Sequence, residues 1–162
     1  PLYYNHKSTG RPYLGKADNE QKYKSRYIDV DNSPLYEFGY GLSYTKFTYS
    51  NFKLSSAKIN FNQKLKATVE VSNTGNFDGE EVVQLYIRDK VGSVTRPVKE
   101  LKGFQKIFLK KGEKKTVEFE ISIEDLKFYG IDMQFAAEPG DFEIFVGGTS
   151  ATDMKLEFEL VK

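Results

Sequence analysis

The sequence predicts an antiparallel β-sandwich that follows an irregular N-terminal segment, and three observations support this prediction. From residue 44 onward, apolar residues recur with a period of two, which is typical of strands with one buried face. Turn signals separate these runs at intervals of roughly 10 to 15 residues, and a helical period is almost absent. With 162 residues, 39% hydrophobic and 29% charged, the chain has an ordinary globular composition and enough length for a core.

The first three predicted strands differ in how clearly they alternate. The first begins near Tyr44 and runs for about ten residues, with a bulge near Ser50 and Asn51. The second, residues 64–72, alternates apolar and polar residues without a break. The third, residues 81–89, is partly apolar on both faces, so we expect it at the centre of a sheet.

The later strands are delimited by residues that interrupt or end a strand. Pro97 cannot lie inside a ladder, so the fourth strand begins after it and extends to residue 109, with a bulge at Gly103. The remaining predicted elements are a strand with Val117, Phe119 and Ile121, a helical turn over 123–126 capped by Ser122, a short strand with Met133 and Phe135, and strands over 142–146 and 156–160.

Seven or eight such strands indicate a β-sandwich of the immunoglobulin or fibronectin type III kind. The chain has neither Cys nor Trp, so the disulfide and buried tryptophan of antibody domains are absent, and the fibronectin-like version requires neither. A closed barrel is the competing all-β architecture. The uneven strand lengths and the long central pair favour two packed sheets.

The stretch from residue 34 to residue 45 divides the chain in two. Its aromatic residues, Tyr36, Phe38, Tyr40 and Tyr44, alternate with Gly39 and Gly41, so large contact surfaces lie beside backbone positions that tolerate positive φ. One interpretation is that the aromatics fill the base of the sandwich core, and the other is that they form a seam between two bodies. We expect the seam, with residues 1–43 as the irregular tail of a preceding domain plus a linker, and residues 44–162 as the sandwich.

Charge and composition exclude several classes of partner. A formal net charge of +1, with both signs spread along the chain, offers no electrostatic basis for binding nucleic acid or an anionic membrane. No run approaches the roughly 18 apolar residues of a membrane span. The absence of cysteine removes disulfides and thiolate metal sites. We therefore expect no cofactor and no metal ion.

The residues most often used in catalysis are scarce. His6 is the single histidine, so neither a Ser/His/Asp arrangement nor a histidine-rich metal site can form within the chain. The tripeptide at residues 39–41 is Gly-Tyr-Gly, but it lacks the third glycine and the strand-turn-helix frame of a dinucleotide cradle.

Two pairs of acidic residues have the types needed for glycoside hydrolysis, which uses two carboxyl groups across a pocket. Glu80 and Glu81 are adjacent on a predicted strand and point to opposite faces. Asp29 and Asp31 lie in a loop near Arg26, where a turn or an ion pair is the simpler role. Neither pair is predicted to be catalytic.

Three stretches together resemble the C-terminal end of a glycoside hydrolase family 3 β-glucosidase. Residues 3–12 resemble the end of the family's second catalytic domain, and residues 24–30 with 34–45 resemble its linker. The strand motifs that resemble its fibronectin III-like domain are Val-Ser-Asn-Thr-Gly at 71–75, Gly-Glu-Glu-Val-Val-Gln-Leu-Tyr at 79–86, Arg-Pro-Val-Lys-Glu-Leu-Lys-Gly-Phe at 96–104 and Glu-Pro-Gly-Asp-Phe at 138–142.

The resemblance implies a parent enzyme that hydrolyses terminal β-glucosides or related β-glycosides, β-xylosides included, with retention. In that family the nucleophilic Asp and the acid/base Glu belong to upstream domains, so no catalytic residue is assigned here and this chain alone is expected to be inactive. The chain begins at Pro1 and reads as a piece of a longer polypeptide.

The expected partners are the catalytic domains of the same polypeptide, with carbohydrate bound only through them, and the family suggests a periplasmic or secreted location. The alternative that remains open is a stand-alone carbohydrate-binding or adhesion module, which predicts an exposed aromatic row with affinity for oligosaccharides.

Overall fold

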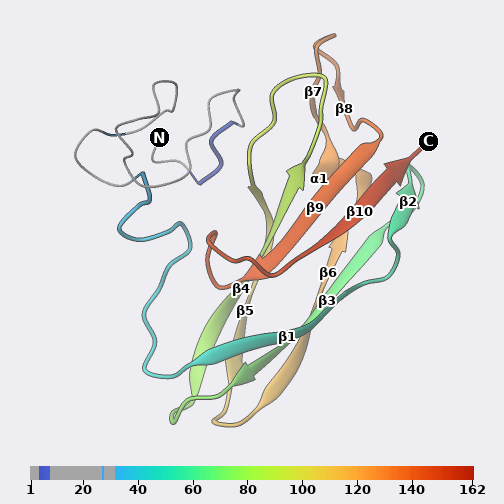
Figure 1. Cartoon of the computed structure of the whole chain (residues 1–162). Coiled ribbons are helices and arrows are strands. Elements are labelled where there is room, and N and C mark those ends of the chain that lie inside the picture. Colours follow the sequence, from blue (N-terminus) through green and yellow to red (C-terminus); the bar gives the residue numbers. More distant parts are fainter. Residues whose placement is uncertain (1–3, 8–26, 28–31) are drawn as a thin grey trace.

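Two β-sheets packed face to face make up the body of the molecule (Figure 1). The computed structural model describes residues 4–7, 27 and 32–162. The described residues form ten strands and one short helix: β1 (Phe47–Leu54), β2 (Lys58–Asn60), β3 (Leu65–Asn73), β4 (Gly79–Asp89), β5 (Glu100–Leu109), β6 (Lys114–Ile121), α1 (Ile123–Leu126), β7 (Phe128–Tyr129), β8 (Phe135–Ala136), β9 (Gly140–Gly147) and β10 (Lys155–Val161).

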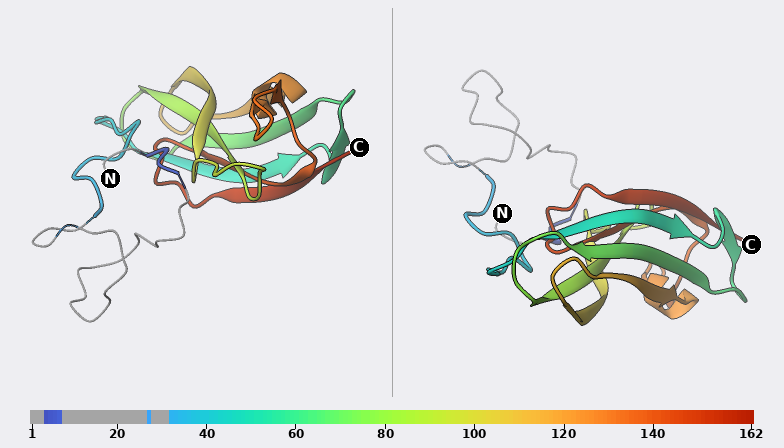
Figure 2. Two further views of the ribbon diagram at one scale, coloured as in Figure 1. Left: turned by 90° about the horizontal axis from the view of Figure 1, so that it is seen from above. Right: turned by 90° about the horizontal axis from the view of Figure 1, so that it is seen from below.

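The sheet topology is that of a sandwich rather than a barrel. One sheet has the order β1-β3-β6 and the other β2-β10-β9-β4-β5, while β7 and β8 form a separate hairpin. Figure 2 shows the two sheets as layers, with residues 32–46 at the end of the sandwich opposite to the C-terminus. The predicted fibronectin III-like antiparallel β-sandwich is confirmed, and β4 has a strand on each side, as its two partly apolar faces indicated.

Alternating residues of the strands fill the space between the sheets. On β3 every second residue from Leu65 to Val71 is buried, and the same holds on β6 from Val117 to Ile121. Phe142 of β9 stacks on Phe158 of β10 with ring centroids 5.2 Å apart. The buried cluster comprises Ile59, Leu65, Ala67, Val69, Val71, Val83, Leu85, Ile87, Leu109, Val117, Phe119, Ile121, Leu126, Ala137, Phe142, Ile144, Val146, Phe158 and Leu160.

Both predicted bulges are present. The register of β1 against β3 shifts between Ser50 and Lys53, where Asn51 has a φ of 53°. In β5 the register shifts so that Leu85 pairs with Gly103 and Tyr86 pairs with Leu101. These extra residues bend the edges of the two sheets, and in β1 the apolar side chains on either side of the bulge, Phe47 and Tyr49 before it and Phe52 and Leu54 after it, all pack against the core.

Some elements differ from the predictions. The strands β2 and β7, of three and two residues, were not predicted because such short runs carry no measurable period, and β2 pairs in parallel with β10. The expected strand with Met133 and Phe135 is correct only at Phe135, since Met133 lies in the preceding turn with a φ of 60°. The predicted cap of α1 is present, with the Asp125 carboxylate accepting hydrogen bonds from the backbone N–H and the hydroxyl of Ser122.

Asn73, at the end of β3, joins the end of the linker to both sheets. Its side-chain amide donates to the backbone carbonyls of Phe77, at 2.8 Å, and of Leu109, at 3.1 Å. Its side-chain oxygen accepts from the Thr45 hydroxyl at 2.6 Å and from the backbone N–H of Gly75 at 3.1 Å. Because Asn73 and Thr45 are buried, this network fixes the point where the linker enters the sandwich.

A hydrogen bond between Tyr49 and Glu81 crosses from one sheet to the other. The Tyr49 hydroxyl donates to Glu81 Oε1 at 2.5 Å. Burial raises the pKa of the Glu81 carboxyl above its ordinary value, and the hydrogen bond from Tyr49 opposes this only in part. Burial, together with the hydrogen bond to Glu81 and its charge, also raises the pKa of Tyr49. Glu81 is therefore a carboxylate whose ionisation costs folding free energy.

We expect Glu81→Gln to make the protein more stable at pH 7 and equally stable at pH 4. The pKa of Glu81 is higher in the folded protein than in the unfolded chain, where a Glu titrates near 4.3. The protonated carboxyl group therefore stabilises the fold fully below the unfolded pKa, and this contribution is lost as the pH rises through the folded pKa. Glutamine keeps an acceptor for Tyr49 and never ionises. Urea unfolding at both pH values measures the difference. The control is Glu80→Gln, because Glu80 is the neighbouring residue and its side chain is ion-paired with Lys106 on the outer face. A lower stability of Glu81→Gln at pH 7 would contradict this account.

Candidate functional site

The outer face of the five-stranded sheet is the surface on which the N-terminal residues lie. Alternate side chains of residues 83–87 on β4 point into the core, so Gln84 and Tyr86 point outward. Tyr86 lies in register with Phe145 of β9. All three outward side chains are buried, which on a free sheet face requires a cover.

Tyr4 provides part of that cover. Its ring stacks on Phe38 with centroids 4.2 Å apart and an interplanar angle of 17°, and it meets Tyr86 edge-on at 5.8 Å. The backbone N–H of Leu101 donates to the Tyr4 hydroxyl at 3.3 Å. Three aromatic rings from distant parts of the sequence thus form one cluster on the sheet, an arrangement in which offset and edge-on pairs are favourable.

The backbone of the same segment is held as well. Lys7 forms an antiparallel bridge with Pro97, and the N–H of Val98 donates to the carbonyl of His6 at 2.9 Å. Proline has no N–H, so the neighbouring Val98 supplies the donor. The first described residues are therefore attached to the loop that precedes β5.

Gln84 fastens the linker to the sheet. Its amide nitrogen donates to the carbonyl oxygens of Gly39, at 3.2 Å, and Gly148, at 2.5 Å, and its amide oxygen accepts from the Tyr86 hydroxyl. The N–H of Ser150 donates to the Phe38 carbonyl at 2.9 Å. Gly39 has a φ of 83°, and a Cβ there would lie 2.0 Å from the Gln84 amide oxygen, so only glycine permits this approach.

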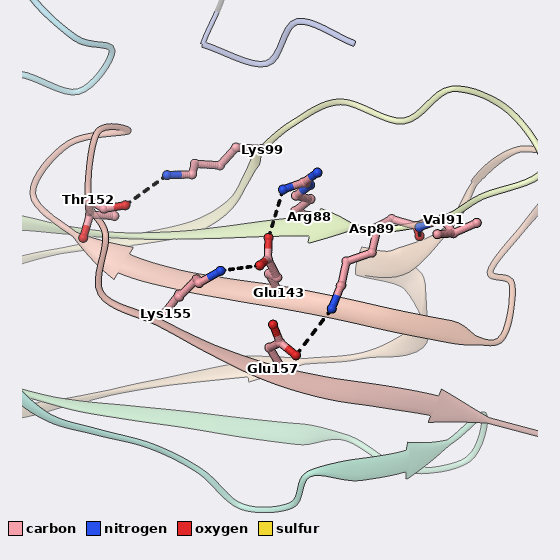
Figure 3. Close-up of polar contacts among 9 residues, drawn as sticks. Arg88, Asp89, Val91, Lys99, Glu143, Thr152, Lys155 and Glu157 are labelled. Atoms are coloured by element: carbon pink, nitrogen blue, oxygen red, sulfur yellow. Dashed lines mark hydrogen bonds and ion pairs between the residues drawn. The ribbon is translucent and has the colours of Figure 1, made fainter. Parts of the chain in front are cut away.

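Lys99 holds the loop that receives the linker. Its ammonium group lies 4.1 Å from the centre of the Phe145 ring and donates to the carbonyls of Ser150, at 2.8 Å, and Thr152, at 3.1 Å; Figure 3 shows the contact with Thr152. Burial lowers the pKa of Lys99. Its position over an aromatic ring and under two carbonyls is that of a structural clamp.

A charged row crosses the same face beside the aromatic cluster (Figure 3). Glu143 of β9 accepts from Arg88 at 3.2 Å and from Lys155 at 2.5 Å, and Lys90 pairs with Glu157 at 3.4 Å. Burial favours the neutral form of Glu143, but the hydrogen bonds and charges of Lys155 and Arg88 outweigh it and hold the pKa of Glu143 below its usual value. Glu143 is therefore an ion-paired structural carboxylate.

The linker row, Tyr36, Phe38, Tyr40 and Tyr44, is exposed to solvent, with exposed fractions of 64%, 46%, 45% and 96%. Tyr36 and Tyr40 contact each other with ring centroids 5.0 Å apart. The interpretation that these four side chains fill the base of the core is wrong, because none of them is buried. Gln84 holds the backbone of this row at Gly39, between Phe38 and Tyr40, and Asn73 holds the side chain of Thr45, next to Tyr44.

The candidate catalytic residues are not brought together. Glu80 pairs with Lys106 on the outer face and Glu81 bonds Tyr49 between the sheets, so their side chains diverge as predicted. Asp29 and Asp31 lie outside the described residues. Residues 4–7, 27 and 32–162 contain no group of His, Cys, Asp and Glu side chains able to hold a metal ion, and no helix there is long and apolar enough to cross a membrane.

The sequence did not single out Gln84, Lys99 or Phe145 as a site. The available signal was the partly apolar outer face of β4, which indicated that a second layer covers it. It could not indicate which distant residues supply that layer.

Comparison with known proteins gives consistent matches. Residues 81–150 match the model of the fibronectin type III-like domain. The chain is 53% identical to a periplasmic beta-glucosidase of Salmonella typhimurium over 99% of its own length and 46% identical to a putative beta-xylosidase of Formosa agariphila over 96%. It spans 21% of the length of each of these relatives.

Among solved structures, the chain superposes on a beta-glucosidase from Listeria innocua in complex with isofagomine. The TM-score is 0.90 at 40% identity, and the match covers 98% of this chain and 22% of that one. The fold, the matched domain and the nearly end-to-end identity show that the chain corresponds to the part of the glycoside hydrolase family 3 β-glucosidases and β-xylosidases that contains their fibronectin type III-like domain.

Proposed function

We propose that this chain is the non-catalytic C-terminal part of a β-glucosidase and that it buttresses the catalytic domains of the same polypeptide through the linker row. Residues 1–43 form the tail of the preceding domain and the linker, and residues 44–162 form the sandwich. The observation that supports this most directly is the exposure of four aromatic side chains on a segment that is held to the sandwich at Gly39 and at Thr45. Rigid exposed aromatics are typical of interface anchors.

The proposed substrate class, terminal β-glucosides or β-xylosides, rests on the names of the relatives. Carbohydrate is bound by the upstream domains only. A periplasmic location is part of the same proposal, because the Salmonella relative is described as periplasmic. The alternative of a stand-alone carbohydrate-binding module is not favoured, since the relatives match the linker and the sandwich together.

The test replaces Tyr36, Tyr40 and Tyr44 with serine, both in this chain and in the full-length polypeptide. In the isolated chain the exposed rings contribute little, so the free energy of unfolding should change by less than about 0.5 kcal/mol. In the full-length protein, removal of interface anchors should cost about 2 kcal/mol or more and shorten the half-life of aryl β-glucosidase activity on heating. The matched control is Tyr129→Ser on β7, another exposed tyrosine.

Two results would contradict a role without catalysis and without carbohydrate binding in this chain. One is turnover of an aryl β-glucoside by the isolated chain that is lost when one of its acidic residues is replaced. The other is calorimetric binding of cellobiose or laminaribiose by the isolated chain, which the module hypothesis requires. If the full-length triple variant and its parent lose activity at the same rate on heating, the linker row does not stabilise the full-length protein.

A further inference from the structure

Among the described residues, one part of the outer sheet face is exposed to solvent. Where β4, β9 and β10 run side by side, the face is covered by Tyr4, Lys99 and the charged row. Over β4 and β5 it presents Val82, Phe104 and Phe108, with exposed fractions of 38%, 66% and 47%. These three side chains, which we call the sheet patch, share the outward face, because Phe104 lies opposite Gln84, and Phe108 opposite Glu80, in the β4–β5 register.

The sheet patch is continuous with the linker row. Gln84, the cross-strand neighbour of Phe104, donates to the Gly39 carbonyl at 3.2 Å, directly beside Phe38 and Tyr40. At the start of β4, a Cβ on Gly79 would meet Thr45 at 2.8 Å and Phe47 at 3.4 Å, on the side that faces the other sheet. The linker therefore reaches the outer face of β4 at Gln84, beside Phe104, and passes the inner side of the strand at Gly79.

The sheet patch also lies at an edge. Within the described residues β5 has a neighbouring strand on one side only, namely β4. A sheet edge bearing exposed aromatic side chains is prone to pair with other chains, and natural proteins cover or charge such edges. Beside the patch, Lys106 and Glu80 pair at 2.6 Å and neutralise each other, and the Lys115 ammonium group donates to the Phe108 carbonyl at 2.7 Å, yet the rings of Phe104 and Phe108 stay exposed.

We propose that the sheet patch is a second docking surface for the catalytic domains of the same polypeptide, so that the seam extends from the linker onto β4 and β5. This inference rests on the proposed function. The relatives have about four-fifths of their length outside the matched region, since the chain spans 21% of them. A body joined through the linker would be held beside the patch at an effective concentration in the millimolar range, which a second copy does not reach at ordinary concentrations.

Hydrogen exchange measured by mass spectrometry tests the proposal in the isolated chain and in the full-length polypeptide. Peptides from residues 100–109 should exchange at least about tenfold more slowly in the full-length protein, because a covered edge strand opens less often. Peptides from residues 128–136, the β7–β8 hairpin, serve as the internal control and should exchange equally in both. Equal exchange at residues 100–109 overturns the proposal.

The double variant Phe104→Lys, Phe108→Lys should abolish the slower exchange in the full-length protein while leaving the melting temperature of the isolated chain within about 2 °C, since both side chains are exposed. Phe135→Lys on β8 is the matched control and should change neither quantity. Self-association of the isolated chain through the patch is the alternative. If the double variant removes that self-association, and residues 100–109 are not protected from hydrogen exchange in the full-length protein, the patch binds a second copy and the proposal is overturned.

Peptides from residues 34–45 separate the two proposals. Protection of this linker in the full-length protein together with unchanged exchange at residues 100–109 overturns only the sheet patch. Absence of protection at both places contradicts the proposed seam as well.

Discussion

Replacement of Asn73 by alanine is expected to lower the free energy of unfolding by about 3 kcal/mol, because two donors and two acceptors would lose a partner in a buried site. Leu109 is fully buried and Thr45 is 8% exposed, so the groups that lose Asn73 have few other partners. Such a loss corresponds to a fall in melting temperature of roughly 10 °C for a chain of this size.

Urea unfolding of the isolated chain measures the effect. Asn76→Ala, an exposed asparagine in the loop that follows β3, is the matched control and should stay within about 0.5 kcal/mol of the parent. Asn73→Asp sharpens the test, because the carboxylate keeps both acceptor contacts but faces two carbonyl oxygens, so it should be at least as damaging as alanine. If Asn73→Ala is no worse than Asn76→Ala, the network does not fix the linker.

Replacement of Gln84 by glutamate is expected to release the linker from the sheet. The carboxylate cannot donate to the carbonyls of Gly39 and Gly148, and it would repel both oxygens. Chymotryptic cleavage within residues 36–44 should therefore become at least about tenfold faster, since a loss of 1.4 kcal/mol in docking multiplies the open population by ten. The effect should weaken on acidification, because a protonated carboxyl group can again donate to one carbonyl.

Cleavage is followed under conditions in which circular dichroism shows the sandwich still folded. Gln134→Glu, the same change at an exposed turn position between β7 and β8, is the control and should leave the cleavage rate unchanged. An unchanged rate in Gln84→Glu would mean that Tyr4 and the Ser150 contact are sufficient to hold the linker.

The strands were predictable because each has its own local pattern. Residues from Leu65 to Val71 alternate so regularly that burial on one face follows from the sequence alone. The bulge at Gly103 showed as a phase slip between Leu101 and Phe104. Only short strands and parallel pairings, such as that of β2 with β10, have no recognisable pattern in the local sequence.

The site was less predictable because it is made by contacts between residues far apart in the sequence. The aromatic residues of the linker were visible, but their exposure depends on how Gln84 holds Gly39, a contact across 45 positions. Tyr4 and Leu101 are 97 positions apart. The function of Lys99 as a clamp could not be read from its neighbours, because its partners come from a loop some fifty residues later.

The cover on the outer sheet face also fixes an order of events during synthesis. Tyr4 and Phe38 leave the ribosome before the surface that receives them, which requires β4 together with β9 and is complete only at Gly147. At roughly 5–20 residues per second, the aromatic segment waits on the order of ten seconds before its docking surface exists. These aromatic residues are therefore secured only after about a hundred later residues have been made.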